Sequence, residues 1–150
     1  TDEFAKLMNQ EALALGATNS HFINPHGLHS EDHYTTVYDM YLIFQAALAQ
    51  EQFVSVISAQ NHTASFTRST GETASMDWVN TNKYLSGEVE TPEGVQVIGG
   101  KTGTTNDAGY CLVLYSKNSQ NVPHISIIYK SDSRENLYHE MTELLLESTK

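Results

Sequence analysis

The stretch GGKTGTTNDAGYCLVLY, residues 99–115, places a lysine after two glycines, follows it with threonines, and then runs into an apolar, aromatic segment. Lysines and arginines together number only 8 in the chain, against 18 aspartates and glutamates, so the position of this cation needs an explanation. The apolar segment after the TTND turn signal is β-prone, as are residues 95–102 before it. The stretch therefore predicts two neighbouring strands with a short connection, which favours antiparallel pairing.

The flanking sequence predicts helices on both sides of these strands. Apolar residues recur at helical spacing over residues 2–15 and again over 37–48. Thr36 precedes the second segment and Asp39 stands three residues later, which is the pattern of a capping box. An amphipathic helix is expected from about Arg134. The residues that this last helix should bury are Leu137, Met141, Leu144 and Leu145.

The strand signals are concentrated in the second half of the chain. Residues 95–102, 109–116 and 124–130 are β-prone and are separated by polar turn signals. Residues 61–80 predict a further, looser hairpin with a turn at 70–72. Helices first, then strands with short links, then a final helix predict an α+β fold in which helices flank an antiparallel β-sheet.

Length and charge limit the functional classes. The chain has 150 residues, the size of one ordinary domain. Its formal net charge of −10 argues against nucleic acid or an anionic membrane as partner, because no basic patch could release counterions. The single cysteine, Cys111, cannot form an intramolecular disulfide and is expected to be a small buried hydrophobe.

Lys101 first suggests a phosphate-binding loop, but the pattern fails. The G-x-x-x-x-G-K-[ST] motif needs a glycine six residues before the lysine, and that position is Val95. The residues after Thr102 should also open a helix whose N-terminal amides bind phosphate, whereas residues 109–115 are apolar and β-prone. Both spacing and context exclude the nucleotide site.

An edge strand beside a ligand explains Lys101-Thr102-Gly103 better. In an extended chain Lys101 and Gly103 share one face and Thr102 takes the other, unless the strand twists. The missing Cβ of Gly103 lets a ligand backbone lie along the strand. The N–H groups around Thr104 are then available as donors to the oxyanion of an acyl transfer.

Lys-Thr-Gly is also one of three motifs of the penicillin-recognising serine enzymes. Three segments resemble, in order, successive stretches of the serine-type D-alanyl-D-alanine carboxypeptidases: FAKLMNQEALALGATNSHFINPHGL (4–28), HYTTVYDMYLI (33–43) and GGKTGTTNDAGYCLVLYSKN (99–118). The resemblance runs from about Phe4 to about Leu146. It implies that residues 1–150 are the C-terminal portion of one catalytic domain with a penicillin-binding-protein transpeptidase-like fold.

The resemblance implies roles for particular residues. Lys101 and Thr102 would act as catalytic and substrate-binding residues that anchor the terminal carboxylate and stabilise charge near the nucleophile. Gly103 and Thr104 would complete the binding strand, with the Thr104 N–H in the oxyanion hole. Arg134, near the start of the last helix, would also meet the carboxylate. We therefore expect the Lys101 ammonium at the lip of a groove, facing the C-terminal end of a bound peptide.

The implied reaction needs a nucleophile that this sequence lacks. In the family a serine attacks the penultimate D-Ala carbonyl, D-Ala leaves, and water releases the acyl-enzyme. No S-x-x-K occurs in the chain, and S-x-N occurs only after Lys-Thr-Gly, in 116–118 and 119–121, where turn residues are expected. We expect the chain alone to be inactive and to need the N-terminal part of the same domain.

The family also implies partners and a location. The substrate would be the peptidoglycan pentapeptide ending in D-Ala-D-Ala, and the intact enzyme would bind β-lactams. Because that substrate lies outside the cytoplasmic membrane, the protein would be extracytoplasmic, either secreted or anchored in the cell envelope. No cofactor is implied.

Two other functions stay open. Four histidines, with Glu31 and Asp32 nearby, could bind zinc, although their spacing is not that of the helical H-E-x-x-H motif; they are His21, His26, His29 and His33. The other alternative is a non-catalytic module that binds cell-wall peptide through the Lys101 strand, which the missing nucleophile favours.

Overall fold

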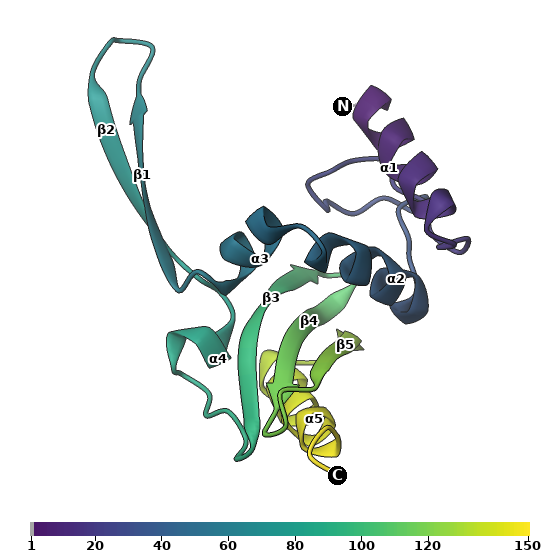
Figure 1. Cartoon of the computed structure of the whole chain (residues 1–150). Helices are drawn as coiled ribbons and strands as arrows, with labels where there is room; N and C mark the ends of the chain where they lie inside the picture. The colour runs from purple at the N-terminus through teal and green to yellow at the C-terminus, as the bar shows by residue number, and fades with distance from the viewer. Residues whose placement is uncertain (1) are drawn as a thin grey trace.

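The computed structural model describes residues 2–150 and contains the helices and strands that the sequence predicts, together with two short helices, one after the second predicted helix and one between the hairpin and the main strands (Figure 1). The helices are α1 (Asp2–Ala14), α2 (Val37–Leu48), α3 (Glu51–Ser58), α4 (Lys83–Ser86) and α5 (Arg134–Glu147). The strands are β1 (Asn61–Thr67), β2 (Thr73–Val79), β3 (Val95–Thr105), β4 (Gly109–Asn118) and β5 (Pro123–Ser131).

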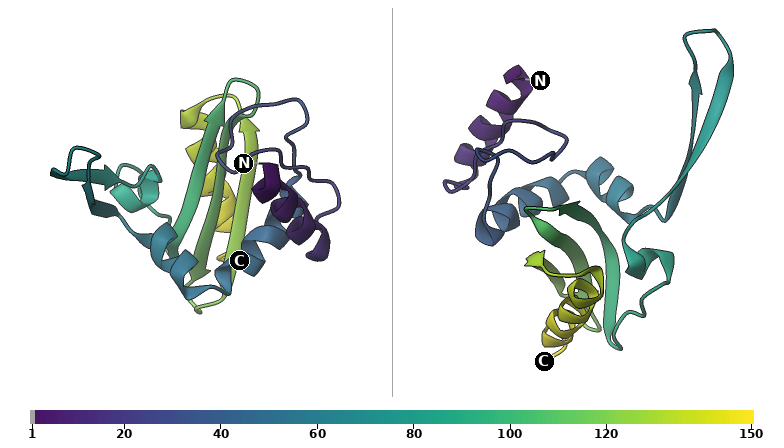
Figure 2. Two further views of the ribbon diagram at one scale, coloured as in Figure 1. Left: turned by 90° about the horizontal axis from the view of Figure 1, so that it is seen from above. Right: turned by 180° about the vertical axis from the view of Figure 1, so that it is seen from behind.

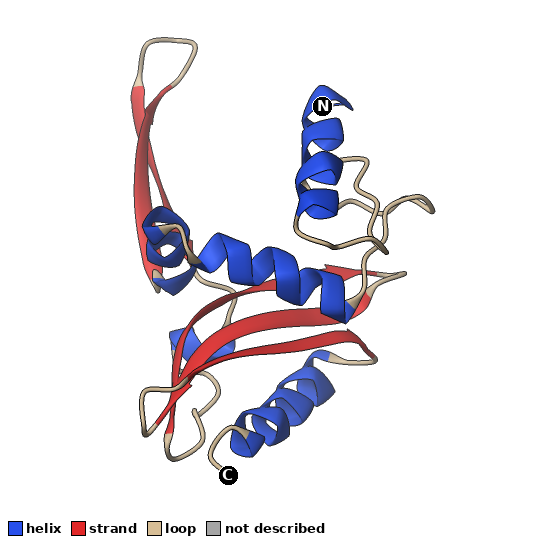
Figure 3. Ribbon diagram, turned by 45° about the vertical axis from the view of Figure 1, so that its right-hand side comes forward, coloured by secondary structure: helices blue, strands red, loops and turns tan. Residues whose placement is uncertain are grey.

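The main sheet consists of β3, β4 and β5 in that order, and both strand pairs are antiparallel. Helix α5 covers one face of this sheet, while α2 and α3 cover the other (Figure 3). Strands β1 and β2 form a separate antiparallel hairpin that projects away from the sheet (Figure 1). The predicted α+β fold, with an antiparallel sheet flanked by helices, is confirmed.

The face of the sheet that contacts α5 contains the best-buried core. Leu112 and Leu114 of β4 pack with Met141 and Leu145 of α5, and all four have 0% exposure. Alternate residues of a strand and residues four apart on a helix each share a face, which explains this pattern. The predicted burial of Leu144 is wrong, because its side chain is 38% exposed.

The opposite face of the sheet packs against α2 and α3. Phe44 of α2 and Ile57 of α3 contact Val113 of β4. Strand β3 runs so close to α3 that a Cβ on Gly99 would lie 2.7 Å from the carbonyl oxygen of Ile57. Within residues 2–150 no single helix is long and apolar enough to cross a bilayer; α2 and α3 pass that test only as a pair, and they are bent by 108°.

Helix α1 is less buried than its apolar periodicity suggests. Ala5 and Ala12 are buried, but Phe4 and Leu7 are more than half exposed. The helix lies beyond α2 and away from the main sheet, as two further views show (Figure 2). The apolar stripe of α1 is therefore largely uncovered within the described residues.

The predicted N-cap of α2 is present, and α5 also begins with a side-chain cap. Thr36 Oγ1 accepts a hydrogen bond of 3.1 Å from the Asp39 N–H, and Ser133 caps α5. The buried carboxylate of Asp39 accepts two hydrogen bonds of its own, from the Asn19 N–H and the Ser20 hydroxyl, both 2.7 Å long. Asp39 therefore joins the first turn of α2 to the loop that follows α1.

Candidate active site

Strand β3 places the lysine-threonine-glycine stretch at the edge of the main sheet. The register pairs Lys101 with Val113 and Thr102 with Leu112. Val113 packs with α2 and α3, whereas Leu112 packs with α5. Lys101 therefore faces the side of α2 and α3, and Thr102 faces the side of α5. The alternation expected from the sequence holds in the structure.

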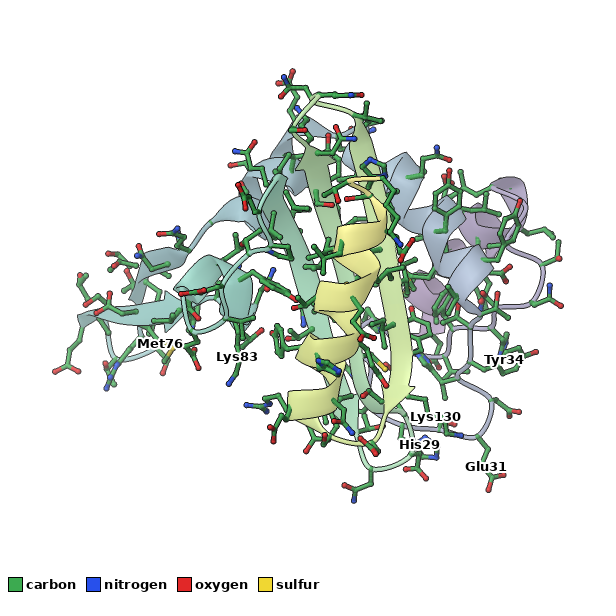
Figure 4. All side chains as sticks on the ribbon, turned by 90° about the horizontal axis from the view of Figure 1, so that it is seen from below. His29, Glu31, Tyr34, Met76, Lys83 and Lys130 are labelled. Carbon is green, nitrogen blue, oxygen red and sulfur yellow. The ribbon has the colours of Figure 1, made fainter. Side chains whose placement is uncertain are left out.

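A cavity of about 330 Å³ opens between β3, α4 and α5. Thr102 and Thr104 line it from β3, and Arg134 lines it from the first turn of α5. Thr81, just before α4, and Lys83, at its start, add polar groups to the wall. Figure 4 shows Lys83 on α4, to one side of α5. Three of the predicted site residues, Thr102, Thr104 and Arg134, thus meet in one place.

Lys101 and Gly103 lie elsewhere. Neither residue lines this cavity or the second one described below. The Lys101 ammonium donates a hydrogen bond to the carbonyl oxygen of Thr102, and the side chain is exposed. Strand alternation points Lys101 away from the face that forms the cavity. The expected position of its ammonium at the lip of a groove stays a prediction.

Hydrogen bonds connect the residues around the cavity. The hydroxyl oxygens of Thr81 and Thr102 are 2.6 Å apart. The backbone N–H of Lys83 donates to the hydroxyl of Tyr138 over 2.9 Å, and the Lys83 ammonium lies 6.0 Å from the centre of the Tyr138 ring. Burial raises the pKa of Tyr138, so this hydroxyl stays protonated at neutral pH. The guanidinium of Arg134 lies 6.0 Å from the centre of the Tyr110 ring.

Two cations and one anion set the charge of the cavity. Lys83 and Arg134 are the cations, and Glu88 is the anion. A hydrogen bond from Ser86, followed by the effect of Lys83, lowers the pKa of Glu88, so this carboxylate is ionised at neutral pH. The Lys83 ammonium lies 3.3 Å from it. Arg134 is therefore the cation that remains for an anionic ligand.

Sequence reasoning missed Thr81, Lys83 and Tyr138 as lining residues. The only available signal was the Asn-Thr-Asn run before α4, in which Asn82 caps the helix through the Tyr84 N–H. Cys111 was expected to be buried, but it is half-buried and lines the cavity.

A second cavity, of about 410 Å³, lies at the β3–β4 turn and the end of β5. Asp107, Lys130 and Asp132 are among its lining residues. Asp107 also approaches His29 of the long loop after α1, with 3.7 Å between Nδ1 and the carboxylate. Figure 4 shows His29 near Lys130 at this end of the molecule. The cavity shares only Thr104 with the predicted site.

The histidines of that loop do not converge on one point. His21 Nδ1 bonds the carbonyl of Asp32, and His33 Nδ1 accepts the N–H of Ile23. His29 approaches Asp107 instead. Within residues 2–150 no group of three or more histidine, cysteine, aspartate or glutamate side chains could hold a metal ion. The structure thus offers no support for the zinc alternative.

Comparison with known proteins identifies relatives that match most of this chain. The family described as D-alanyl-D-alanine carboxypeptidase matches residues 1–133. The D-alanyl-D-alanine carboxypeptidase DacF of Bacillus subtilis strain 168 is 32% identical over 145 residues, which are 96% of this chain and 34% of that protein. The D-alanyl-D-alanine carboxypeptidase of Streptomyces sp. strain K15 is 34% identical over 111 residues, 73% of this chain and 36% of that protein.

Solved structures show the same fold. A single-residue variant of the Streptomyces K15 DD-transpeptidase superposes with a TM-score of 0.87 at 30% identity, covering 98% of this chain and 54% of that one. A D-alanyl-D-alanine carboxypeptidase from Mycobacterium tuberculosis H37Rv gives a TM-score of 0.75 at 26% identity, covering 95% of this chain and 51% of that one.

This chain spans about a third of the length of its curated relatives and about half of the solved chains. The family match includes the strand with Lys101, Thr102 and Thr104 and ends just before Arg134. Because the match covers most of the sequence and the fold agrees, this chain belongs to the D-alanyl-D-alanine carboxypeptidase family.

Proposed function

We propose that this chain supplies the substrate-anchoring strand of a serine-type carboxypeptidase that trims peptidoglycan stem peptides ending in D-Ala-D-Ala. The observation that carries the proposal is the meeting of Thr102, Thr104 and Arg134 in one polar cavity beside the edge strand. Hydroxyls and a guanidinium are donors suited to a carboxylate. The names of the relatives, D-alanyl-D-alanine carboxypeptidases, support the substrate class.

The opposite face and the free edge of the same strand would serve the reaction itself. We assign Lys101 to charge stabilisation near the nucleophile and the Thr104 N–H to the oxyanion hole. A peptide lying along the free edge of β3 would approach both groups. A Cβ on Gly103 would meet nothing closer than 4.0 Å, at the Cβ of Cys111. The absence of a side chain at Gly103 therefore serves clearance for a ligand rather than packing.

The nucleophilic serine would come from the N-terminal part of the same domain. The 150 residues contain no S-x-x-K, and the relatives are two to three times as long as the matched region. The exposed apolar residues of α1, Phe4 and Leu7, offer a surface for that part. In the complete domain the serine Oγ attacks the penultimate D-Ala carbonyl carbon, the C–N bond breaks, D-Ala leaves as the amine, and water hydrolyses the resulting ester.

The proposed function implies a location for the protein and a class of inhibitors. Stem peptides lie outside the cytoplasmic membrane, so the protein would be secreted or anchored in the cell envelope. β-Lactams would acylate the serine of the complete domain, and the reaction would need no cofactor.

The second candidate is a non-catalytic module that binds the same peptide. The observation that favours it is the presence of the polar cavity in a sequence without S-x-x-K. Both candidates predict carboxylate binding, and only the carboxypeptidase predicts acylation.

Mass spectrometry after incubation with benzylpenicillin separates the two candidates. We expect no covalent adduct on residues 1–150 alone and one adduct on a form that includes the N-terminal part of the domain. In that longer form Lys101→Ala should slow acylation by roughly 10²-fold, as for loss of one group that stabilises developing charge. A stable adduct on residues 1–150 alone, or an unchanged acylation rate in Lys101→Ala, would contradict these assignments.

Carboxylate binding is tested on the chain by itself. NMR titration with a synthetic stem peptide ending in D-Ala-D-Ala should shift the amide signals of Thr102 and Thr104 and the guanidinium signal of Arg134. The matched control is the same peptide with a C-terminal carboxamide, which should bind more weakly. Equal affinity for the two peptides would remove the proposed anchor.

A further inference from the structure

Two hydroxyl groups meet at the wall of the cavity. Thr81 Oγ1, just before α4, lies 2.6 Å from Thr102 Oγ1 on β3. A threonine hydroxyl has a single hydrogen to donate. If Thr102 donates to Thr81, its hydrogen is used within the wall; if Thr81 donates to Thr102, the hydrogen of Thr102 is free for a ligand. An anion in the cavity selects the second arrangement, because a carboxylate only accepts hydrogen bonds.

We propose that Thr81 is a positioning residue that turns the Thr102 hydroxyl toward the terminal carboxylate of the bound peptide. This inference rests on the proposed function, in which Thr102 contacts that carboxylate. Thr81 acts through Thr102: its hydroxyl fixes the rotamer of Thr102 and polarises the Thr102 O–H as a donor. The family resemblance assigned no role to this residue.

The backbone on both sides of Thr81 is fixed. Asn80 Nδ2 donates to the carbonyl of Ala59 over 2.8 Å, and Asn80 Oδ1 accepts the N–H of Asn82 over 2.9 Å. Asn82 Oδ1 in turn accepts the N–H of Tyr84, 3.2 Å away, in the first turn of α4. Thr81 is therefore an exposed side chain on a constrained backbone, which lowers the entropic cost of holding its hydroxyl against β3.

Helix α5 supports the same segment through Tyr138. The Tyr138 ring is buried, and its hydroxyl accepts the Lys83 N–H over 2.9 Å and points at the carbonyl of Thr81 over a longer 3.4 Å. Arg134 stands four residues earlier on α5, hence on the same face of the helix, and lines the cavity. One helix thus places both the guanidinium and the segment that carries Thr81.

The test uses residues 1–150 and the two peptides described above, ending in carboxylate and in carboxamide. The measured quantity is the dissociation constant of the carboxamide peptide divided by that of the carboxylate peptide. This ratio reports carboxylate recognition and is insensitive to a partial loss of folded protein. Thr81→Val should reduce this ratio about two- to tenfold, the effect of one lost hydrogen bond. Thr81→Ser keeps the hydroxyl and should restore the ratio to the unsubstituted value.

A matched control removes an equivalent bond far from the cavity. Thr63 of β1 donates its hydroxyl to Asp77 of β2 on the exposed hairpin. Thr63→Val should leave the ratio unchanged. Tyr138→Phe keeps the buried ring but removes the hydroxyl that receives the Lys83 N–H, and it should lower the ratio in the same direction as Thr81→Val.

A second readout needs no ligand. Three-bond NMR couplings to the Thr102 methyl group report its χ1 rotamer, which should be single in the unsubstituted chain and in Thr81→Ser but averaged in Thr81→Val. An unaltered rotamer and an unaltered ratio in Thr81→Val would overturn the positioning role.

The same experiment separates this inference from the proposed function. Thr102→Val should abolish most of the carboxylate preference. If Thr102→Val does so and Thr81→Val does not, the positioning role is wrong and the proposed function stands. If the unsubstituted chain shows no carboxylate preference, or Thr102→Val leaves it intact, the proposed anchor is wrong and the inference falls with it.

Discussion

The two halves of strand β3 have different surroundings. In the first half, a Cβ on Gly99 would press on the backbone of Ile57, and a Cβ on Gly100 would lie within 2.7 Å of Leu114 and closer still to the carbonyl oxygen of Val113. In the second half, a Cβ on Gly103 would have nothing nearer than 4.0 Å. We call residues 95–100, which pack against the core, the packed half of the strand. Residues 101–105 form its open half.

One half of the strand therefore holds β3 in the fold, and the other half is available to bind a ligand. The packed half fixes the position and twist of β3 relative to β4 and α3. It thereby limits the movement of the residues that follow in the same strand. The open half then presents Thr102 and Thr104 to the cavity and Lys101 to the other face without being enclosed. A precise site on a rigid strand needs both halves.

Breaking the packed half should have the largest effect on stability. Leu114 is fully buried opposite Gly100, between the sheet and α5. Leu114→Ala should lower the free energy of unfolding by about 2–5 kcal/mol, because it removes apolar contacts and leaves a cavity. Urea denaturation followed by circular dichroism measures this loss, and a change below about 1 kcal/mol would show that the core is not where the packing places it.

Overpacking the same half should cost somewhat less. Gly100→Ala introduces a Cβ against the backbone of Val113 and the side chain of Leu114. Because the obstacle includes backbone, we expect a loss of about 1–3 kcal/mol in the free energy of unfolding. The measurement is again urea denaturation, and a stabilised variant would mean that β3 and β4 can separate at this position without cost.

The loop after α1, which reaches the β3–β4 turn through His29 and Asp107, should make stability depend on pH. Burial, followed by the charges of His21, His26 and His29, lowers the pKa of His33 from its ordinary value of 6.5. The folded chain then binds fewer protons at His33 than the unfolded chain, so the free energy of unfolding falls as the pH drops through 6.5 and below.

Replacement of His33 tests the direction of this pH dependence. His33→Gln keeps an acceptor for the N–H of Ile23, which His33 Nδ1 now accepts over 3.2 Å, but it cannot be protonated. The fall in stability between about pH 7 and pH 5 should be shallower in this variant. Denaturation curves at several pH values measure the slope, and a steeper fall in His33→Gln would contradict the direction.

Substitutions in the open half should have the smallest effects on stability. Gly103→Ala meets no close neighbour, and Lys101→Ala removes an exposed side chain. Both should change the free energy of unfolding by less than about 0.5 kcal/mol. Together with Gly100→Ala they form a matched set along one strand. Equal destabilisation by Gly100→Ala and Gly103→Ala would remove the difference between the two halves.

Local patterns in the sequence were sufficient for most of the secondary structure. Helical periodicity and the Thr36 cap predicted α2, and alternation predicted which residues of β3 share a face. The antiparallel arrangement followed from connections too short to cross over. These features depend on neighbours in the chain, which is why one sequence was enough to find them. Resemblance to a family then indicated one site of five residues, of which three line the cavity and Lys101 and Gly103 do not; the three are Thr102, Thr104 and Arg134.

Tertiary structure alone decided which groups meet and which do not. The cavity joins Thr81, Thr102 and Arg134 from three elements that are distant in sequence, while Lys101 turns to the other face and α1 keeps its apolar stripe exposed. Burial depends on which faces of separate elements come into contact, and no local periodicity encodes that contact. The sequence therefore determined the elements and the chemistry that they carry, and the packing of α4 and α5 against β3 determined the site.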